Sequence, residues 1–228
     1  MTKAAAPQPY LRRRGRLTTA QARALGRLSG RYLVDLPETA VDAGFWRGVF
    51  GRVGPLAIET CFGNGAALAH LAKSHPTWNC LGVDVYRPGF GALILACERD
   101  GLDNVRIADA EVLGLLRRLE PGTVHRVSAF FPDPWPKKRH HKRRLVNEDF
   151  AAAATACLEV GGTLHLATDW DDYAAQMIDV LDAAPDLAGG VTGRSERPVT
   201  PFEAKGIAGG RRVVDLAYRR LAPGGGMP

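Results

Sequence analysis

The sequence lacks paired cysteines and long apolar runs. Its four cysteines, at positions 61, 80, 97 and 157, include no C-x-x-C pair. This scatter argues against a structural zinc site and against a disulfide framework, so we expect reduced thiols and no bound metal. No run approaches the roughly 18 apolar residues of a membrane span, and residues 1–10 lack the apolar core of a signal peptide. We therefore expect a cytoplasmic protein with no membrane contact.

The chain also has no long low-complexity segment, so its 228 residues predict a single core. We expect one domain over residues 18–222, a flexible basic arm over residues 1–17 and a disordered tail over residues 223–228. The formal net charge of +6 favours a polyanionic partner. No heptad or long apolar edge indicates an interface, so a monomer and a homodimer both remain open.

Short apolar runs alternate with helical patterns from residue 56 onward. This alternation predicts an α/β fold, a mostly parallel sheet with helices on both faces. In such sheets ligands bind beyond the carboxyl ends of the strands. Strands are expected at residues 56–59, 78–85, 105–108, 124–131, 164–168 and 213–218, and helices at 18–28, 66–73, 91–99, 112–119, 150–158 and 173–181.

A glycine turn joins the first strand to the helix that follows it. Gly63 and Gly65 would let a ligand approach the backbone and meet the helix N-terminus. Asp84 ends the second strand 19 residues after Gly65, close to the spacing of roughly 20 at which an acid binds ribose hydroxyls. Leu68 stands where a dinucleotide site has its third glycine, which argues against that site. A turn with a purely structural role is the alternative.

Further acidic residues stand at the other strand ends. Asp109 and Ala110 end the third strand, where a carboxylate or the backbone can meet an adenine edge. With Glu59 and Asp84, Asp109 makes three acids at three successive strand ends, which favours a nucleotide-like ligand. Asp133 follows the fourth strand between two prolines, which fix φ and favour extended geometry in the residue before each. We therefore expect Asp133 on a stiff loop.

A dense basic run, residues 137–144, follows Asp133 directly, and residues 12–16 add four arginines. Both suit an RNA backbone, with a solvated face or tail as the alternative. Trp135 either stacks on a base or anchors the loop in the core. His140 and His141 have no neighbouring ligand at metal spacing, so we assign no metal. The predicted phosphate contacts are Arg13, Arg14, Arg16, Lys138, Arg139, Lys142, Arg143 and Arg144.

Seven segments taken together indicate a family. They are RRGRLT (13–18), ExxFGxG (59–65), GVDV (82–85), FFPDPWPK (130–137), HKRR (141–144), ATDW (167–170) and RPVTxFE (197–203). With them, residues 10–218 resemble the bacterial tRNA (guanine-N7)-methyltransferase family. The FFPDPW segment with its basic tail is highly specific, and TxFE is an independent second signature.

The resemblance implies an α/β, Rossmann-like class I methyltransferase fold with a mostly parallel seven-stranded sheet. It also implies S-adenosylmethionine as cofactor and tRNA as partner. It further implies methyl transfer to N7 of a variable-loop guanosine, position 46 in tRNA numbering. Asp133 would be catalytic. The implied cofactor site is Glu59, Cys61, Gly63, Gly65, Asp84, Asp109, Ala110 and Asp133, and the implied substrate site is Lys137, Asp169, Thr200, Phe202 and Glu203.

One position departs from the family pattern, because Cys61 replaces the first loop glycine. A left-handed conformation there would cost a non-glycine residue roughly 1 kcal/mol or more. The hypothesis is that Cys61 adopts a negative φ and that the cofactor still binds.

The chemistry needs no strong base, because guanine N7 carries a free lone pair. Asp133 would then orient the reactants and stabilise the charge that appears on the purine. Asp169 and Glu203 can accept from the guanine edge, while Lys137 or Thr200 can donate. The alternatives are a cap of the helix near residue 171 for Asp169 and an exposed loop charge for Glu203. Two alternative functions remain open for the whole protein: a methyltransferase that acts on an exocyclic amine of a base, and a non-catalytic RNA-binding module.

Overall fold

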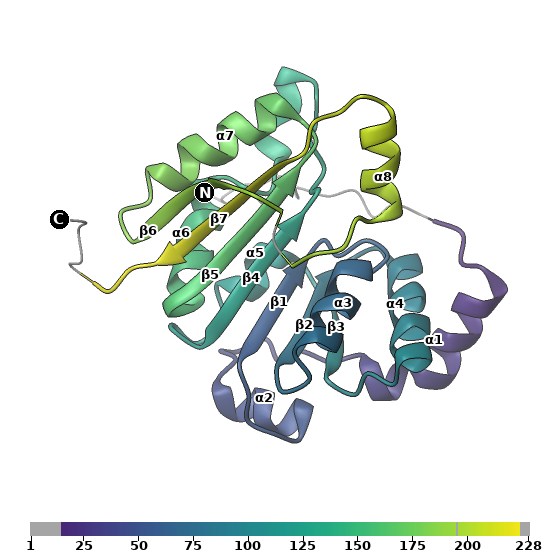
Figure 1. Cartoon of the computed structure of the whole chain (residues 1–228). Helices are drawn as coiled ribbons and strands as arrows, with labels where there is room; N and C mark the ends of the chain where they lie inside the picture. Colours follow the sequence, from purple (N-terminus) through teal and green to yellow (C-terminus); the bar gives the residue numbers. More distant parts are fainter. Residues whose placement is uncertain (1–14, 195, 224–228) are drawn as a thin grey trace, which may run out of the picture.

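A seven-stranded sheet with the order β3-β2-β1-β4-β5-β7-β6 crosses the middle of the molecule (Figure 1). The computed structural model describes residues 15–194 and 196–223. Strands β1 to β5 pair in parallel, whereas β7 is antiparallel to both β5 and β6. The bounds are β1 (Leu56–Thr60), β2 (Asn79–Asp84), β3 (Val105–Asp109), β4 (Val124–Phe130), β5 (Leu158–Thr168), β6 (Leu187–Thr192) and β7 (Val214–Arg220).

Helices cover both faces of this sheet, because alternate strand residues point to opposite sides and each side carries an apolar cluster. Ile58 of β1 belongs to one cluster, and its neighbour Ala57 belongs to the other. Helices α2 (Ala43–Phe50), α5 (Val112–Leu116), α6 (Glu148–Cys157) and α7 (Asp171–Asp182) contribute to the first cluster, and α1 (Thr19–Tyr32), α3 (Ala66–Ser74) and α4 (Arg87–Asp100) to the second. The predicted mostly parallel seven-stranded sheet with helices on both faces is confirmed.

The first helix is longer than expected. A capping box at its start pairs Thr18 with Gln21, and the helix runs to Tyr32 because that ring is fully buried. The Tyr32 hydroxyl donates to Glu98 of α4 at 2.6 Å. Of the predicted arm, residues 1–14 lie outside the described residues, as do residues 224–228 of the predicted tail.

Four elements lie where no regular structure was expected: α2, β6, the 3-10 helix η1 (Lys138–Arg143) and α8 (Pro201–Ala208). Helix α2 is short and begins where the Asp42 carboxylate caps the N–H of Phe45 at 2.7 Å. Strand β6 contains two glycines, which hide its strand character, and it forms only by pairing with β7. Each α-helix within the described ranges falls short of the length and apolar character that crossing a bilayer requires.

Candidate active site

A cavity of about 820 Å³ opens at the carboxyl ends of the parallel strands, where α8 also lies (Figure 1). It brings together acids from β1, β2, β4 and β5 that are far apart in the sequence. The predicted site residues among its lining are Glu59, Cys61, Gly63, Asp84, Ala110, Asp133, Arg143, Asp169, Thr200 and Phe202. The lining also includes Gly15, Tyr86, Phe131, Trp170 and Arg211, for which no role was predicted.

The turn after β1 is left-handed at three positions. Cys61 has a φ of 53°, so the predicted negative φ is wrong. Its N–H donates to the Val83 carbonyl at 2.8 Å, which holds the chain against β2 while it turns toward α3. Gly65 has a φ of 75°, and a Cβ there would lie 2.7 Å from Leu93. The turn therefore needs glycine at Gly65 and accepts the conformational cost at Cys61.

Asp84 fastens this turn to the end of β2. Its Oδ2 accepts from the Gly63 N–H at 3.1 Å, while Oδ1 accepts from Val85 and Tyr86 at 2.7 and 3.0 Å. Burial raises the pKa of Asp84 above its usual range, although the three N–H donors oppose that shift. The side chain still lines the cavity, so it can accept from a ligand hydroxyl while it orders the loop.

Glu59 lies deeper, at the end of β1, with only 4% of its surface exposed. Burial and then the nearby charge of Asp84 raise its pKa to about 8, and Arg197 opposes the shift. The carboxyl group is therefore mostly protonated at neutral pH.

At the end of β3, only one of the two predicted site residues reaches the cavity. Ala110 lines the cavity, whereas Asp109 is exposed and outside the lining. Of these two residues, Ala110 is therefore the one placed to meet a ligand.

The loop that carries Asp133 is more contorted than expected. Phe131, the residue before Pro132, has a φ of 53°, so the predicted extended geometry is wrong there, and Trp135 has a φ of 43°. Such conformations cost about 1 to 3 kcal/mol each and persist where the surroundings enforce them. Here the Phe131 N–H donates to Ala167 of β5 at 2.7 Å. The result places Asp133 at the cavity wall with its side chain exposed.

Arg144 provides a second constraint on that loop, and its predicted contact with RNA phosphates is wrong. The residue is 1% exposed. Its Nε donates to the Pro134 carbonyl at 2.8 Å, and its two terminal nitrogens bind Gln176 and Asp172 of α7 at 2.8 and 2.7 Å. A guanidinium with all three nitrogens engaged inside the fold braces the loop and is not accessible to a phosphate.

The other cations of the basic run are less buried than Arg144. Lys138, Arg139 and Lys142 are exposed on η1. Lys137 is exposed too, but it is not among the cavity-lining residues. Of the predicted arm contacts, Arg16 is exposed, and Arg13 and Arg14 lie outside the described residues.

Trp135 stands between this basic run and the cavity. It belongs to neither apolar cluster, which excludes the predicted core anchor. The Arg143 guanidinium lies 5.0 Å from its ring centroid, and the His140 ring meets it edge-on at 5.8 Å. Arg143 and His140 therefore hold the Trp135 ring in place, and the residue lines the cavity.

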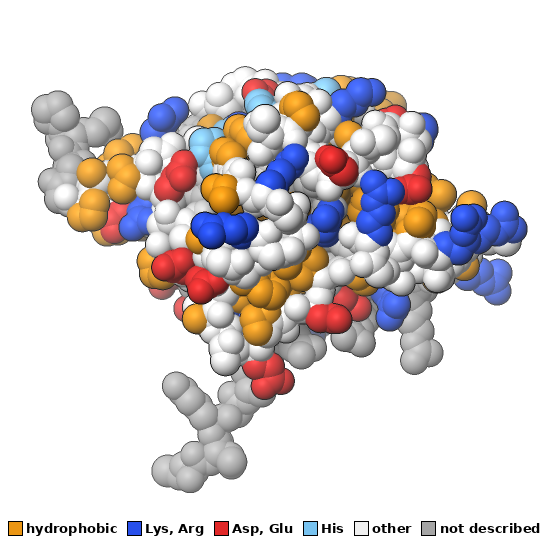
Figure 2. Space-filling model, turned by 90° about the horizontal axis from the view of Figure 1, so that it is seen from below, with side chains coloured by type: hydrophobic (Ala, Val, Ile, Leu, Met, Phe, Trp, Pro, Cys, Tyr) orange, Lys and Arg blue, Asp and Glu red, His pale blue; other side chains and the backbone are white. Residues whose placement is uncertain are grey.

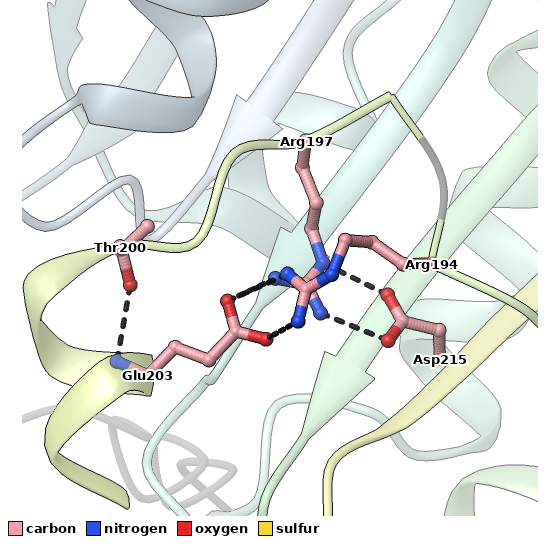
Figure 3. A network of polar contacts seen from close by, with 5 residues as sticks. All are labelled: Arg194, Arg197, Thr200, Glu203 and Asp215. Atoms are coloured by element: carbon pink, nitrogen blue, oxygen red, sulfur yellow. Dashed lines mark hydrogen bonds and ion pairs between the residues drawn. The ribbon is translucent and has the colours of Figure 1, made fainter. Parts of the chain in front are cut away.

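Glu203 neither lines the cavity nor sits on the surface. It is fully buried, and Arg194 and Arg197 bind its carboxylate (Figure 3). Arg197 also binds both oxygens of Asp215 at 2.8 Å. Burial alone would raise the pKa of Glu203, but the two arginines outweigh it and hold that pKa below its usual range. The predicted guanine contact and the exposed-charge alternative are both wrong for Glu203.

The network fixes α8 at the edge of the cavity. Thr200 caps the helix, its Oγ1 accepting from the Glu203 N–H at 3.2 Å (Figure 3). Phe202 projects from the first turn, is 57% exposed and lies 5.5 Å from the Phe131 ring, centroid to centroid. The TxFE segment therefore contributes Thr200 and Phe202 to the cavity and uses Glu203 as its anchor.

Asp169, after β5, has only 6% of its side chain exposed and pairs with Arg211 at 2.7 Å. It does not cap α7, because Trp170 holds that position with no side-chain cap. Sequence reasoning missed Arg211, because an arginine in a Gly-Gly-Arg-Arg turn carries no distinguishing signal. Among the described residues, no group of three or more His, Cys, Asp or Glu side chains is placed to hold a metal ion.

Comparison with known proteins agrees with this geometry. The family model described as "Putative methyltransferase" matches residues 53–216. The tRNA (guanine-N(7)-)-methyltransferase of Alkalilimnicola ehrlichii is 46% identical over 92% of this chain and 91% of its own. The enzyme of the same name from Halorhodospira halophila is 44% identical over 92% and 93%.

Solved structures share the fold at low identity. The antibiotic-resistance methyltransferase Kmr superposes with a TM-score of 0.56 at 16% identity, over 83% of this chain and 95% of its own. The 16S rRNA (adenine(1408)-N(1))-methyltransferase from Catenulisporales acidiphilia, solved with its cosubstrate SAM, gives 0.55 at 16% identity over 86% and 96%. The fold is thus that of class I methyltransferases, and the matching family model and the identity to curated relatives show that the chain belongs to the tRNA (guanine-N7)-methyltransferase family.

Proposed function

We propose that this protein transfers a methyl group from S-adenosylmethionine to N7 of a guanosine in the variable loop of tRNA. The observation that carries the proposal is the shared cavity, where Asp84 and the glycine turn meet Asp133, Asp169 and the tip of α8. The side of the cavity with Asp84 and the glycine turn has the acceptors that suit an adenosine-type cofactor. The side with Asp169 and the tip of α8 has the polar and aromatic groups that suit a purine. The two reactants would meet beside Asp133.

The residues on the cofactor side fit S-adenosylmethionine. The space above Gly63 is open, because a Cβ there would meet nothing within 4 Å. Asp84 would accept from the ribose hydroxyls, and the Ala110 backbone would face the adenine. A volume of about 820 Å³ is sufficient for such a ligand together with a base. The cofactor supplies an electrophilic methyl group on a sulfonium.

The reaction needs positioning and not proton removal. A bond forms between N7 and the methyl carbon as the carbon–sulfur bond breaks, and that bond's electron pair goes to sulfur, leaving a neutral thioether. The purine gains the positive charge. Asp133 would orient the base and stabilise that charge, which is an electrostatic role.

The tRNA backbone would lie on the exposed cations of η1, next to Trp135. Lys138, Arg139 and Lys142 are within one 3-10 helix, so their charges add on one surface. The opposite face, at the amino ends of the parallel strands, shows basic and acidic side chains interspersed (Figure 2). The charge distribution therefore favours RNA binding on the cavity side.

The test is incubation of the protein with labelled methyl donor and bulk unmodified tRNA, followed by nucleoside identification. We expect label in N7-methylguanosine, and aniline cleavage after reduction should map it to the variable loop. Label on an exocyclic amine would support that alternative reaction, and tRNA binding without transfer would support the RNA-binding module. Cleavage at a different loop would contradict the proposed position.

A further inference from the structure

Arg211 is a cation at the cavity wall to which the reaction described above assigns no role. Its Nη1 donates to Asp169 Oδ2 at 2.7 Å, and both residues line the cavity. Asp169 has 6% of its side chain exposed, whereas Arg211 has 49%. A guanidinium carries five N–H donors, so pairing with Asp169 leaves most of them for a ligand. The pair thus presents an acceptor and a donor side by side.

The surrounding structure holds this pair in place. Asp169 follows β5, and Arg211 follows α8, where its backbone N–H donates to the Gly206 carbonyl at 3.0 Å. Gly206 is buried, and a Cβ on it would lie 3.0 Å from Asp169 Oδ2 and 3.8 Å from Arg211 Cδ. The missing side chain allows α8 to pack directly against the pair. The buried Glu203 network fixes α8 in turn.

We propose that Arg211 and Asp169 together read the O6 and N1–H edge of the target guanine, a proposal that rests on the proposed function. Arg211 donates to O6, and the second oxygen of Asp169 accepts from N1–H. Guanine presents this acceptor and donor next to each other. Adenine presents a donor at its 6-position and a lone pair at N1, so both contacts would become repulsive. Arg211 is therefore a specificity-determining residue.

The charge of Asp169 explains why the donor is a paired arginine. N7 methylation makes the purine positive, and an isolated guanidinium at O6 would oppose that charge. The ion pair supplies the same N–H without a net charge. As the purine becomes positive its N1–H becomes a stronger donor, so the contact with Asp169 tightens in the transition state. Loss of Asp169 should therefore lower kcat, while loss of Arg211 should mainly weaken selection of the base.

The experiment uses two tRNAs: one with the guanosine that the wild type methylates, and one with 2-aminopurine in its place. 2-Aminopurine keeps N7 but lacks O6 and N1–H. We expect Arg211→Ala to lower kcat/KM on the guanosine tRNA about 10- to 100-fold, as for loss of a charged hydrogen bond. On the 2-aminopurine tRNA it should change little, so the preference for guanine shrinks by a comparable factor.

The matched control is Arg212→Ala, the next residue along, whose side chain is 80% exposed and lies 4.0 Å from Asp171. It should keep the wild-type preference. Arg211→Lys retains a cation but loses the planar fork and should be intermediate. Equal losses on both tRNAs with Arg211→Ala, or an unchanged preference, would overturn the proposal.

Calorimetric titration of Arg211→Ala with S-adenosylmethionine checks that the cavity is intact, and wild-type affinity is expected. If that variant fails to bind the cofactor, the guanine preference of Arg211→Lys decides instead. A wild-type protein that makes no N7-methylguanosine in tRNA would refute the proposed function itself, which is a separate result.

Discussion

The backbone geometry of its loop places the Asp133 side chain at the cavity. Phe131 and Trp135, two residues to either side, both have positive φ, and the buried Arg144 binds the carbonyl of Pro134 at 2.8 Å. Strained residues of this kind persist where the fold enforces them and occur often at functional sites. A positioning group benefits from such a loop, because transfer between N7 and a methyl carbon is sensitive to small displacements.

Asp133→Asn should therefore keep the fold and lower kcat by roughly 100-fold, as for loss of one electrostatic stabiliser. Wild-type kcat should change little over the pH range in which the fold is stable, because N7 has no proton to lose. Single-turnover methylation of tRNA across that pH range measures the loss of rate in Asp133→Asn and the pH dependence of the wild-type rate. A wild-type rate that rises tenfold per pH unit and levels off would instead identify Asp133 or another group as a base.

Glu59 predicts a pH dependence of stability. Its pKa is about 8 in the folded protein against an ordinary value of 4.5. Between these values the folded chain keeps a proton that the unfolded chain has lost, so stability falls as pH rises from 4.5 to about 8. Below 4.5 both states hold the proton, and above about 8 the folded state carries a buried carboxylate.

Glu59→Gln should remove this dependence, because the amide stays neutral. Urea unfolding at pH 5.5 and pH 8 should show that the wild type loses more stability between the two than the variant does, by an amount on the order of a few kcal/mol. Glu196→Gln is a suitable control, because that carboxylate is half-exposed and its pKa is lowered by Arg126. Identical pH slopes in the wild type and Glu59→Gln would contradict the assignment.

At the scale of elements, α8 depends on one buried ion-pair network. Helix α8 has eight residues, and only Glu203 and Gly206 of them are buried, so apolar packing alone holds it weakly. Arg197 joins Glu203 to Asp215 of β7, and its side chain is 2% exposed. Arg194 also binds Glu203 but has 35% of its side chain exposed. The two arginines therefore share a partner and differ in burial.

Arg197→Ala should destabilise the protein by about 3 to 5 kcal/mol, because it leaves the buried Asp215 without its cation and Glu203 with Arg194 alone. Arg194→Ala, the matched control, should cost less, about 1 kcal/mol, since Arg194 is partly exposed to water and Glu203 keeps the buried Arg197 as its partner. Chemical denaturation of both variants gives the comparison. Equal losses of stability would show that burial of the Arg197 pairs contributes nothing beyond a surface contact.

The sequence predicted the sheet and the acids at its strand ends, because both follow from short-range patterns. Asp84 and Asp133 were found since the end of a parallel strand is visible as the end of an apolar run. Glu203 and Arg144 were misplaced because a charged residue in a polar segment looks exposed, and only the fold shows that its partners surround it. Arg211 was missed for the same reason, since its partner Asp169 is 42 positions away.

At the scale of the whole molecule, the net charge of +6 says less than where the cations lie. Three of them are exposed on η1, beside the cavity, while Arg144 at the end of the same run is buried. Exposed cations that contact phosphates release counterions, so they set both the affinity for RNA and its dependence on salt. A buried arginine sets neither directly.

Replacement of Lys138, Arg139 and Lys142 by alanine should weaken tRNA binding at low salt and flatten the plot of log affinity against log salt. Each lost phosphate contact should reduce the slope by somewhat less than about 1, so the triple variant should lose about 2 to 3. Arg144→Ala should leave the slope unchanged and lower stability by about 1 to 3 kcal/mol, because the Pro134 carbonyl loses its donor and the Tyr173 ring loses the guanidinium packed on it. Filter binding over a series of salt concentrations, beside urea unfolding, separates the two effects. A changed slope in stably folded Arg144→Ala, or an unchanged slope in the triple variant, would place the RNA on another surface.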